Sequence, residues 1–150
     1  MERRIFIGSD HAGFGLKEEV KKHLSREGYT IGDIGPSAYD KDDDYPDYAV
    51  KVCRKVLSKK GEGILICGSG LGMDRAANKV RGIRASVCWD IRSARNSREH
   101  GDANVLCLGS KFVSRDKALR IVDAWLDTPF SGEERHLRRI RKTMQIERGR

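Results

Sequence analysis

The sequence lacks the long apolar segments that mark membrane and secreted proteins. No run approaches the roughly 20 apolar residues that are needed to cross a bilayer. The charged start, Met1 to Arg4, leads directly into a short strand-like run and not into the apolar region of a signal peptide. We therefore expect no membrane partner and no secretory leader.

Cysteines are few and widely spaced. The chain has four, at Cys53, Cys67, Cys88 and Cys107, and no C-x-x-C pair indicates zinc. Three of them stand in apolar surroundings, where a cysteine is usually a small buried hydrophobe. We expect a cytoplasmic protein without disulfides and without a metal site.

The signatures of nucleic-acid binding are also missing, although the chain is basic. We find no zinc-finger spacing, basic zipper or aromatic-bearing strand motif. The net charge is +8, and residues 131–150 hold seven Arg or Lys and three Glu, which is half of that surplus. This tail is consistent with a solvated basic helix, with a phosphate clamp or with a nucleic-acid patch.

What the chain does have is a regular alternation of strand and helix patterns, with no linker, repeat or low-complexity segment. Strands are predicted at 5–8, 29–34, 63–67, 83–87 and 105–108, and helices at 16–24, 46–57, 73–79, 91–99, 114–126 and over the basic tail. This order predicts one domain over residues 1–150. We expect a three-layer α/β, Rossmann-like fold with a mainly parallel five-stranded sheet and a C-terminal basic helix.

The most informative segment runs from Ile64 to Gly72. An apolar strand ends at Cys67, and three glycines and a serine then lead into a helix. A Gly-rich turn before a helix is suited to bind an anion, because backbone N–H groups approach closely there. A thiol beside it, favoured as thiolate, acts as a base or a nucleophile unless Cys67 is only the last core residue of its strand.

Three other places carry candidate side chains. Asp10 and His11 follow the first strand, where they can bind hydroxyls or shuttle protons, or where Asp10 merely caps the next helix. His100 lies at a helix end before the fifth strand and is either structural or catalytic. Arg135 and Arg139 lie at i and i+4 on one helical face, a spacing that can grip a phosphate but is common on exposed helices.

Together these segments resemble the B-type ribose-5-phosphate isomerases, in the family that also holds allose- and galactose-6-phosphate isomerases. The motifs that carry the resemblance are Gly8 to Gly13, Asp44-Tyr45-Pro46, Ile64 to Gly72, Ala76 to Lys79 with Gly82 to Ala85, Asn104 to Gly109, and Arg135-His136 with Arg139. The resemblance covers nearly the whole chain. It implies aldose–ketose isomerisation of a sugar phosphate without metal or organic cofactor.

The resemblance also implies a role for each candidate residue. Cys67 would be the base that moves a proton between C1 and C2, and His100 would assist ring opening. Asp10 would hold the sugar. Ser69 and the amides of Gly70, Leu71 and Gly72 would hold the enediolate oxygens, and His11, Arg135 and Arg139 would bind the phosphate. Gly68 and Lys111 would also contact the substrate. A homodimer or tetramer with the site shared between subunits is implied, and no nucleic-acid partner.

Departures from the family pattern concern the substrate. Met73-Asp74-Arg75 replaces small and apolar residues, Gly101 stands for a usual Asn, and Lys111 stands for a usual Arg. Ribose 5-phosphate is the leading substrate, and a hexose 6-phosphate such as allose 6-phosphate is the alternative. The alternative from a different functional class is a nucleotide-binding module. It would use the loop from Gly68 to Gly72 with Asp90, although the third glycine comes one residue early for the dinucleotide motif.

Overall fold

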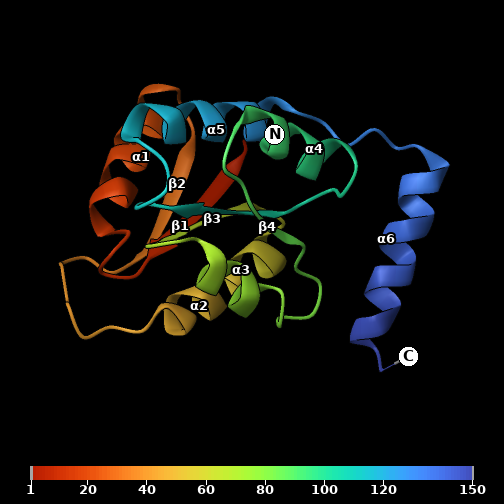
Figure 1. Ribbon diagram of the computed structural model, residues 1–150, viewed down its shortest axis with the longest axis horizontal. Helices are drawn as coiled ribbons and strands as arrows, with labels where there is room; N and C mark the ends of the chain where they lie inside the picture. The colour runs from red at the N-terminus through yellow and green to blue at the C-terminus, as the bar shows by residue number, and fades with distance from the viewer. Residues whose placement is uncertain (1, 150) are drawn as a thin grey trace.

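A five-stranded sheet lies between two layers of helices in the computed structural model, which describes residues 2–149 (Figure 1). In chain order the elements are β1 Arg4–Ser9, α1 Phe14–Arg26, β2 Thr30–Gly35, α2 Tyr45–Lys59, β3 Glu62–Cys67, α3 Leu71–Ala77, β4 Ala85–Val87, α4 Ile91–Glu99, β5 Val105–Gly109, α5 Arg115–Asp127 and α6 Glu134–Glu147. The strand order is β2-β1-β3-β5-β4, and all four strand pairs are parallel. The predicted α/β class and five-stranded parallel sheet are confirmed.

Strand residues alternate between two cores, as the pleat requires. Ile5 and Ile7 of β1 and Ile64 and Ile66 of β3 face the core beneath α1, α4 and α5. Leu65 and its neighbours in register face the core over α2 and α3. Because both faces are covered, these strands carry the near-continuous apolar runs that are typical of parallel sheets.

Most element boundaries differ from the sequence prediction by one or two residues, and two of these differences have a clear local cause. The strand expected at 83–87 is only Ala85–Val87, because the amide of Ile83 closes a turn onto the carbonyl of Val80. The helix expected from Met73 begins at Leu71. Gly70 has a left-handed backbone (φ 79°), so the chain turns from β3 into the helix within three residues.

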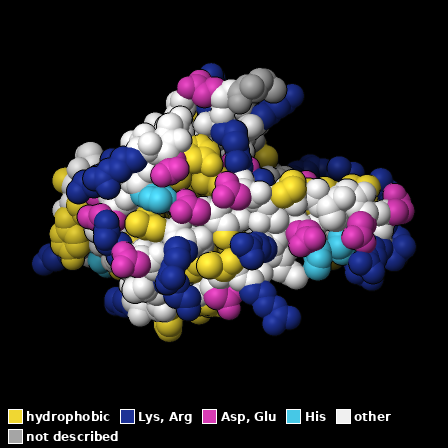
Figure 2. Space-filling model, turned by 90° about the horizontal axis from the view of Figure 1, so that it is seen from above, with side chains coloured by type: hydrophobic (Ala, Val, Ile, Leu, Met, Phe, Trp, Pro, Cys, Tyr) yellow, Lys and Arg dark blue, Asp and Glu magenta, His cyan; other side chains and the backbone are white. Residues whose placement is uncertain are grey.

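Helix α6 stands apart from the layers, beyond the end of α4 (Figure 1). Of its side chains only that of His136 is buried. The face seen in Figure 2 carries Lys and Arg side chains scattered among Asp and Glu, not gathered into one basic stripe. Within residues 2–149, no helix combines the length and the apolar character needed to span a bilayer.

Candidate active site

The sheet places the candidate residues at a switch in its topology. The chain moves from β1 outward to β2 and then crosses to β3 on the other side of β1. In open parallel sheets such a reversal leaves a crevice at the carboxyl ends of the two central strands. Asp10 and His11 follow β1, and the loop from Cys67 follows β3, so both segments meet at this crevice.

Cys67 lies at the end of β3 with its sulfur turned into the glycine loop. The thiol is buried, and the amide of Gly70 donates to Sγ at 3.1 Å. A Cβ on Gly70 would lie 3.0 Å from the carbonyl carbon of Leu108, so only glycine allows this approach. The amide of Leu71 donates to Oγ of Ser69 at 3.1 Å. The sulfur therefore accepts a backbone hydrogen bond in this loop.

The other three cysteines lie in different surroundings. All four thiols are free. Burial raises the pKa of Cys53 to about 12 and that of Cys88 to about 11, and it also raises the pKa of Cys107 well above its ordinary value. These three side chains are thiols at neutral pH. They differ in location from Cys67, which lies beside Asp10 and His11.

Asp10 is nearly buried and contacts the turn that leads into α1. Its Oδ1 accepts the amide of Gly13 at 3.0 Å, and Gly13 is the N-cap residue of α1. Burial raises the pKa of Asp10, while the Gly13 amide and His11 act in the opposite direction. A Cβ on Gly13 would lie 2.3 Å from the carbonyl oxygen of Ile66, so glycine is needed for the turn to pack against β3.

His11 pairs with a residue of the loop between β2 and α2. Its Nδ1 lies 2.8 Å from Oδ1 of Asp43, and its backbone amide donates to the same oxygen at 2.9 Å. The hydrogen bond to Asp43 raises the pKa of His11, and the nearby Asp10 adds to the effect. The imidazole is therefore held toward its charged form.

These side chains share one cavity of about 380 Å³. It is lined by Asp10, His11, Ala12, Tyr45, Cys67, Gly68, Ser69, Gly72, Lys111 and Phe112. The structure thus brings together the predicted residues of the first and third strand ends with Lys111, whose amide donates to the carbonyl of Gly68 at 2.9 Å. Gly70 and Leu71 lie in the same loop but do not line the cavity.

His100 and Arg139 lie elsewhere, in a larger cavity of about 530 Å³ between α6 and the sheet edge. Its lining includes Gly101, Ile140 and Met144 as well. The rings of His100 and His136 stack with centroids 4.3 Å apart, and Nδ2 of Asn96 lies 3.2 Å from Nδ1 of His100. Within one chain, His100 is not brought to Cys67.

Arg135 lines neither cavity. Its Nε lies 2.8 Å from Oε2 of Glu133. The side chain of Arg135 is 59% exposed and that of Glu133 is 50% exposed. Arg135 and Arg139 do share α6, as the spacing predicts. Neither arginine contacts the Cys67 cavity in the part of the chain that the structure describes.

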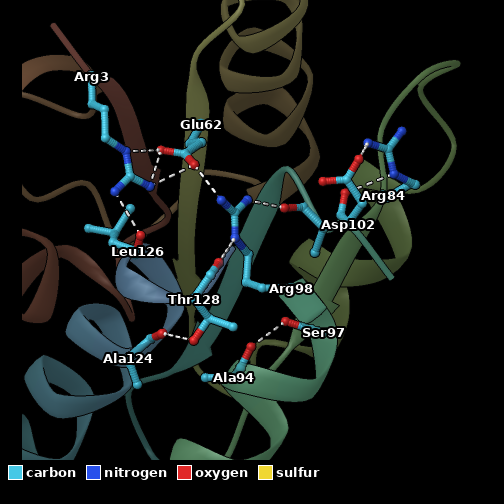
Figure 3. A network of polar contacts seen from close by, with 11 residues as sticks. Arg3, Glu62, Arg84, Ala94, Ser97, Arg98, Asp102, Ala124, Leu126 and Thr128 are labelled. Atoms are coloured by element: carbon cyan, nitrogen blue, oxygen red, sulfur yellow. Dashed lines mark hydrogen bonds and ion pairs between the residues drawn. The ribbon is translucent and has the colours of Figure 1, made fainter. Parts of the chain in front are cut away.

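A polar network fixes the end of α4, from which His100 projects (Figure 3). Arg98 donates to Oε1 of Glu62 at 2.7 Å and to the carbonyl of Thr128 at 3.3 Å. Its guanidinium carbon also lies 4.5 Å from the ring centroid of Trp125. Arg3 donates to the same Glu62 carboxylate at 2.8 Å. The network ties α4 to β3 and α5 on the side of the sheet away from Cys67.

Three cavity residues, Ala12, Tyr45 and Phe112, were not singled out from the sequence as site residues. Tyr45 and Phe112 line the cavity, and Tyr45 packs against Gly72, where a Cβ would lie 2.7 Å from its ring. Asp43, which lies between β2 and α2, belongs to none of the segments singled out from the sequence. The only signal for Tyr45 was its place in a shared motif, and the position of Asp43 depends on a contact across 32 residues of sequence.

Asp74, one of the residues that depart from the family pattern, has both oxygens engaged. Oδ2 accepts the amide of Val87 at 2.7 Å, and Oδ1 accepts Nδ2 of Asn78 at 3.0 Å. These bonds fasten α3 to β4, so the side chain serves the fold. Asp90 likewise caps α4 through the amide of Ser93 at 2.7 Å. One oxygen of the carboxylate that the nucleotide-binding alternative would use is therefore engaged in capping a helix.

One cluster has the donor types of a cation site. Single ligand atoms of Asp10, His11 and Asp43 lie within 4.8 Å of one another. Nδ1 of His11 is already engaged by Asp43, so this nitrogen reaches a cation only after that bond breaks.

The family model for Ribose/Galactose Isomerase matches residues 5–143. The chain belongs to this family. Among curated relatives, it is 45% identical to a probable ribose-5-phosphate isomerase B of Mycoplasma genitalium, covering 99% of this chain and 98% of the relative. It is 44% identical to ribose-5-phosphate isomerase B of Escherichia coli, covering 99% of both chains.

Solved structures agree with this isomerase in fold. The ribose-5-phosphate isomerase B of Clostridium thermocellum superposes with a TM-score of 0.94 at 48% identity, covering 97% of this chain and 98% of the other. The Mycoplasma genitalium enzyme with bound ribulose 5-phosphate gives 0.94 at 43%, covering 99% and 98%. The resemblance inferred from the motifs is confirmed, and so is the prediction that the chain is an aldose–ketose isomerase.

Proposed function

We propose that this isomerase interconverts ribose 5-phosphate and ribulose 5-phosphate, with Cys67 as the base. The observation that carries the proposal is the position of Cys67. Its sulfur faces the glycine loop in a cavity that also holds Asp10, His11 and Lys111. Relatives at 44–45% identity carry the name ribose-5-phosphate isomerase B, and one solved relative holds ribulose 5-phosphate.

The chemistry is a proton transfer through an enediolate. The thiolate of Cys67 takes the proton from C2 of the open-chain aldose, and the C–H electron pair forms the C1–C2 double bond. The charge that develops on the oxygen is stabilised by the hydroxyl of Ser69, whose oxygen accepts the Leu71 amide, and by the amides that follow Leu71 in α3, since the first N–H groups of a helix lack partners within it. The thiol then returns the proton to C1, and the proton of the C2 hydroxyl moves to O1, which gives the ketose.

Two cationic side chains, His11 and Lys111, line this cavity and would meet the phosphate. Asp10 would hold a sugar hydroxyl. Because a lysine is a point charge and not a bidentate fork, Lys111 would hold a phosphate with less directional control than an arginine.

The site is completed in this proposal by a second copy of the chain. His100, Arg135 and Arg139, which the family resemblance assigns to ring opening and phosphate binding, do not reach Cys67 within one chain. Exposed apolar side chains lie at the Cys67 cavity: Phe112 lines it, Trp89 contacts Phe112, and Tyr39 contacts His11. Such a patch is typical of a protein interface. A homodimer in which α6 of the partner covers this cavity would bring both sets together.

The experiment that tests the reaction class uses protein treated with EDTA on a panel of pentose and hexose phosphates. We expect ketose formation from ribose 5-phosphate at an undiminished rate after chelation. Turnover of six-carbon phosphates alone would replace the substrate and keep the class. No turnover of any aldose phosphate would contradict the proposal.

A further inference from the structure

Asp43 lies outside the segments that carry the family resemblance, yet its side chain reaches the candidate active site. It lies in the connection between β2 and α2, 32 residues after His11. Its side chain is only 5% exposed, whereas that of His11 is 35% exposed on the cavity side of the pair. A carboxylate so well covered needs partners, and His11 provides two N–H groups.

Both contacts use one oxygen of Asp43. Oδ1 lies 2.8 Å from Nδ1 of the imidazole and accepts the His11 amide at 2.9 Å. Nδ1 must therefore carry the proton, since a carboxylate only accepts. The ring is fixed at its backbone end and at Nδ1, which leaves Nε2 as the nitrogen that can meet a ligand.

The surroundings of His11 are mostly acidic or neutral. Asp10 precedes it, Cys67 and Lys111 line the same cavity, and the ring of Tyr39 meets the imidazole edge-on with centroids 6.2 Å apart. Tyr45 also lines the cavity. The positive charge of Lys111 disfavours the protonation of His11, whereas the carboxylates of Asp10 and Asp43 favour it.

We infer that Asp43 is a positioning residue, which holds His11 as an imidazolium with Nε2–H free to donate to the phosphate of the substrate. This inference rests on the proposed function for the identity of the substrate. A charge-assisted donor binds a phosphate more strongly than a neutral imidazole does. Phosphate charge does not change during the proton transfer, so the contribution of Asp43 falls on KM and not on kcat.

Asp43→Asn separates charge from shape. The amide oxygen can still accept both His11 N–H groups, but the negative charge is lost. We expect KM for ribose 5-phosphate to rise about 3- to 10-fold near pH 7.5, with kcat within about 2-fold. The alkaline limb of the pH profile of 1/KM should move to lower pH. Asp42→Asn is the matched control, since Asp42 is an exposed acid in the same loop, and it should leave KM and its pH profile unchanged.

A direct measurement does not depend on turnover. The His11 imidazole is titrated by NMR in wild type, Asp43→Asn and Asp42→Asn, and its signal is assigned with His11→Gln. We expect the wild-type pKa of His11 to lie above the ordinary value near 6.5 and to fall only in Asp43→Asn. Inorganic phosphate, used as the probe in the same titration, should shift the His11 signal more weakly in Asp43→Asn.

The outcomes are distinguishable. A wild-type His11 that titrates at or below its ordinary value would overturn the inference even if Asp43→Asn failed to fold. An Asp43→Asn protein with lower thermal stability but unchanged His11 titration and unchanged KM profile would make Asp43 purely structural, and the inference would be wrong. Absence of turnover in wild type would instead contradict the proposed function, while the titration would still decide the role of Asp43.

Discussion

At the scale of single residues, the candidate site consists of two sets of side chains, which the structure holds in different ways. Cys67, Asp10 and His11 are fixed by hydrogen bonds to backbone or carboxylate groups at the strand ends. Arg135 and Arg139 lie on an exposed helix without buried partners. We therefore expect substitutions in the first set to affect chemistry or fold, and those in the second set to affect substrate binding.

Arg139→Ala tests the second set. Charge-assisted hydrogen bonds contribute about 1.5–3 kcal/mol, so kcat/KM for ribose 5-phosphate should fall about 10- to 150-fold. Most of the loss should appear in KM, because the phosphate keeps its charge throughout the reaction. Steady-state kinetics measure both terms.

The control for this prediction is Arg148→Ala, since Arg148 is an exposed arginine just after the same helix. Arg135→Lys should recover only part of the loss caused by Arg135→Ala, because an ammonium cannot reproduce the bidentate fork. Equal and negligible effects at Arg135, Arg139 and Arg148 would leave the tail as a solvated basic helix.

At the scale of helices and strands, most of the fold follows from local patterns. The near-continuous apolar runs of β1, β3 and β5 indicate strands that are covered on both faces. Ser114, the first residue of the predicted helix, caps α5, where its hydroxyl oxygen accepts the Lys117 amide at 3.2 Å. Pro46 lies in the first turn of α2, as expected. These features depend on neighbours within a few residues, which the sequence displays directly.

Long-range contacts could not be obtained in the same way. Nothing local to Asp43 indicates that it reaches His11, and nothing in the helical pattern of α6 indicates that it stands off the sheet (Figure 1). The family resemblance assigns His100 and Cys67 to one site, but the structure places them in different cavities of the same chain.

The end of α4 provides a prediction about stability. Arg98→Ala removes the donors to Glu62 and to the carbonyl of Thr128 and leaves those acceptors partly buried. We expect the free energy of unfolding to fall by about 1.5–3 kcal/mol. Chemical denaturation monitored by circular dichroism measures the change. Arg95→Ala, at an exposed position of the same helix, should alter it by no more than about 0.5 kcal/mol. Equal stability of the two variants would show that the network in Figure 3 contributes little.

At the scale of the whole molecule, the residues around Cys67 and the arginines of α6 are separated within one chain, although the proposed site needs both sets. If the site is shared between subunits, two different inactive variants can complement each other. Cys67→Ala and the double variant Arg135→Ala/Arg139→Ala would each be impaired as homodimers. A mixed dimer contains one site with all the changes and one site with none, because a two-fold interface exchanges the same surfaces.

We expect co-refolded or co-expressed mixtures of these variants to regain about a quarter of wild-type activity, since about half of the dimers are mixed and each has one intact site. Activity is measured with subsaturating ribose 5-phosphate, and each variant refolded alone is the control. Activity no higher than the average of the two separate variants would place the complete site within one chain.

The central claim is that Cys67 is the base, and the kcat of Cys67→Ala with ribose 5-phosphate tests it most directly. General base catalysis typically contributes about 10²- to 10⁴-fold, so kcat should fall by that factor while the circular dichroism spectrum and the unfolding midpoint stay close to wild type. Cys53→Ala makes the same change at another buried thiol and should retain turnover. A Cys67→Ala protein with the kcat of wild type would contradict the account.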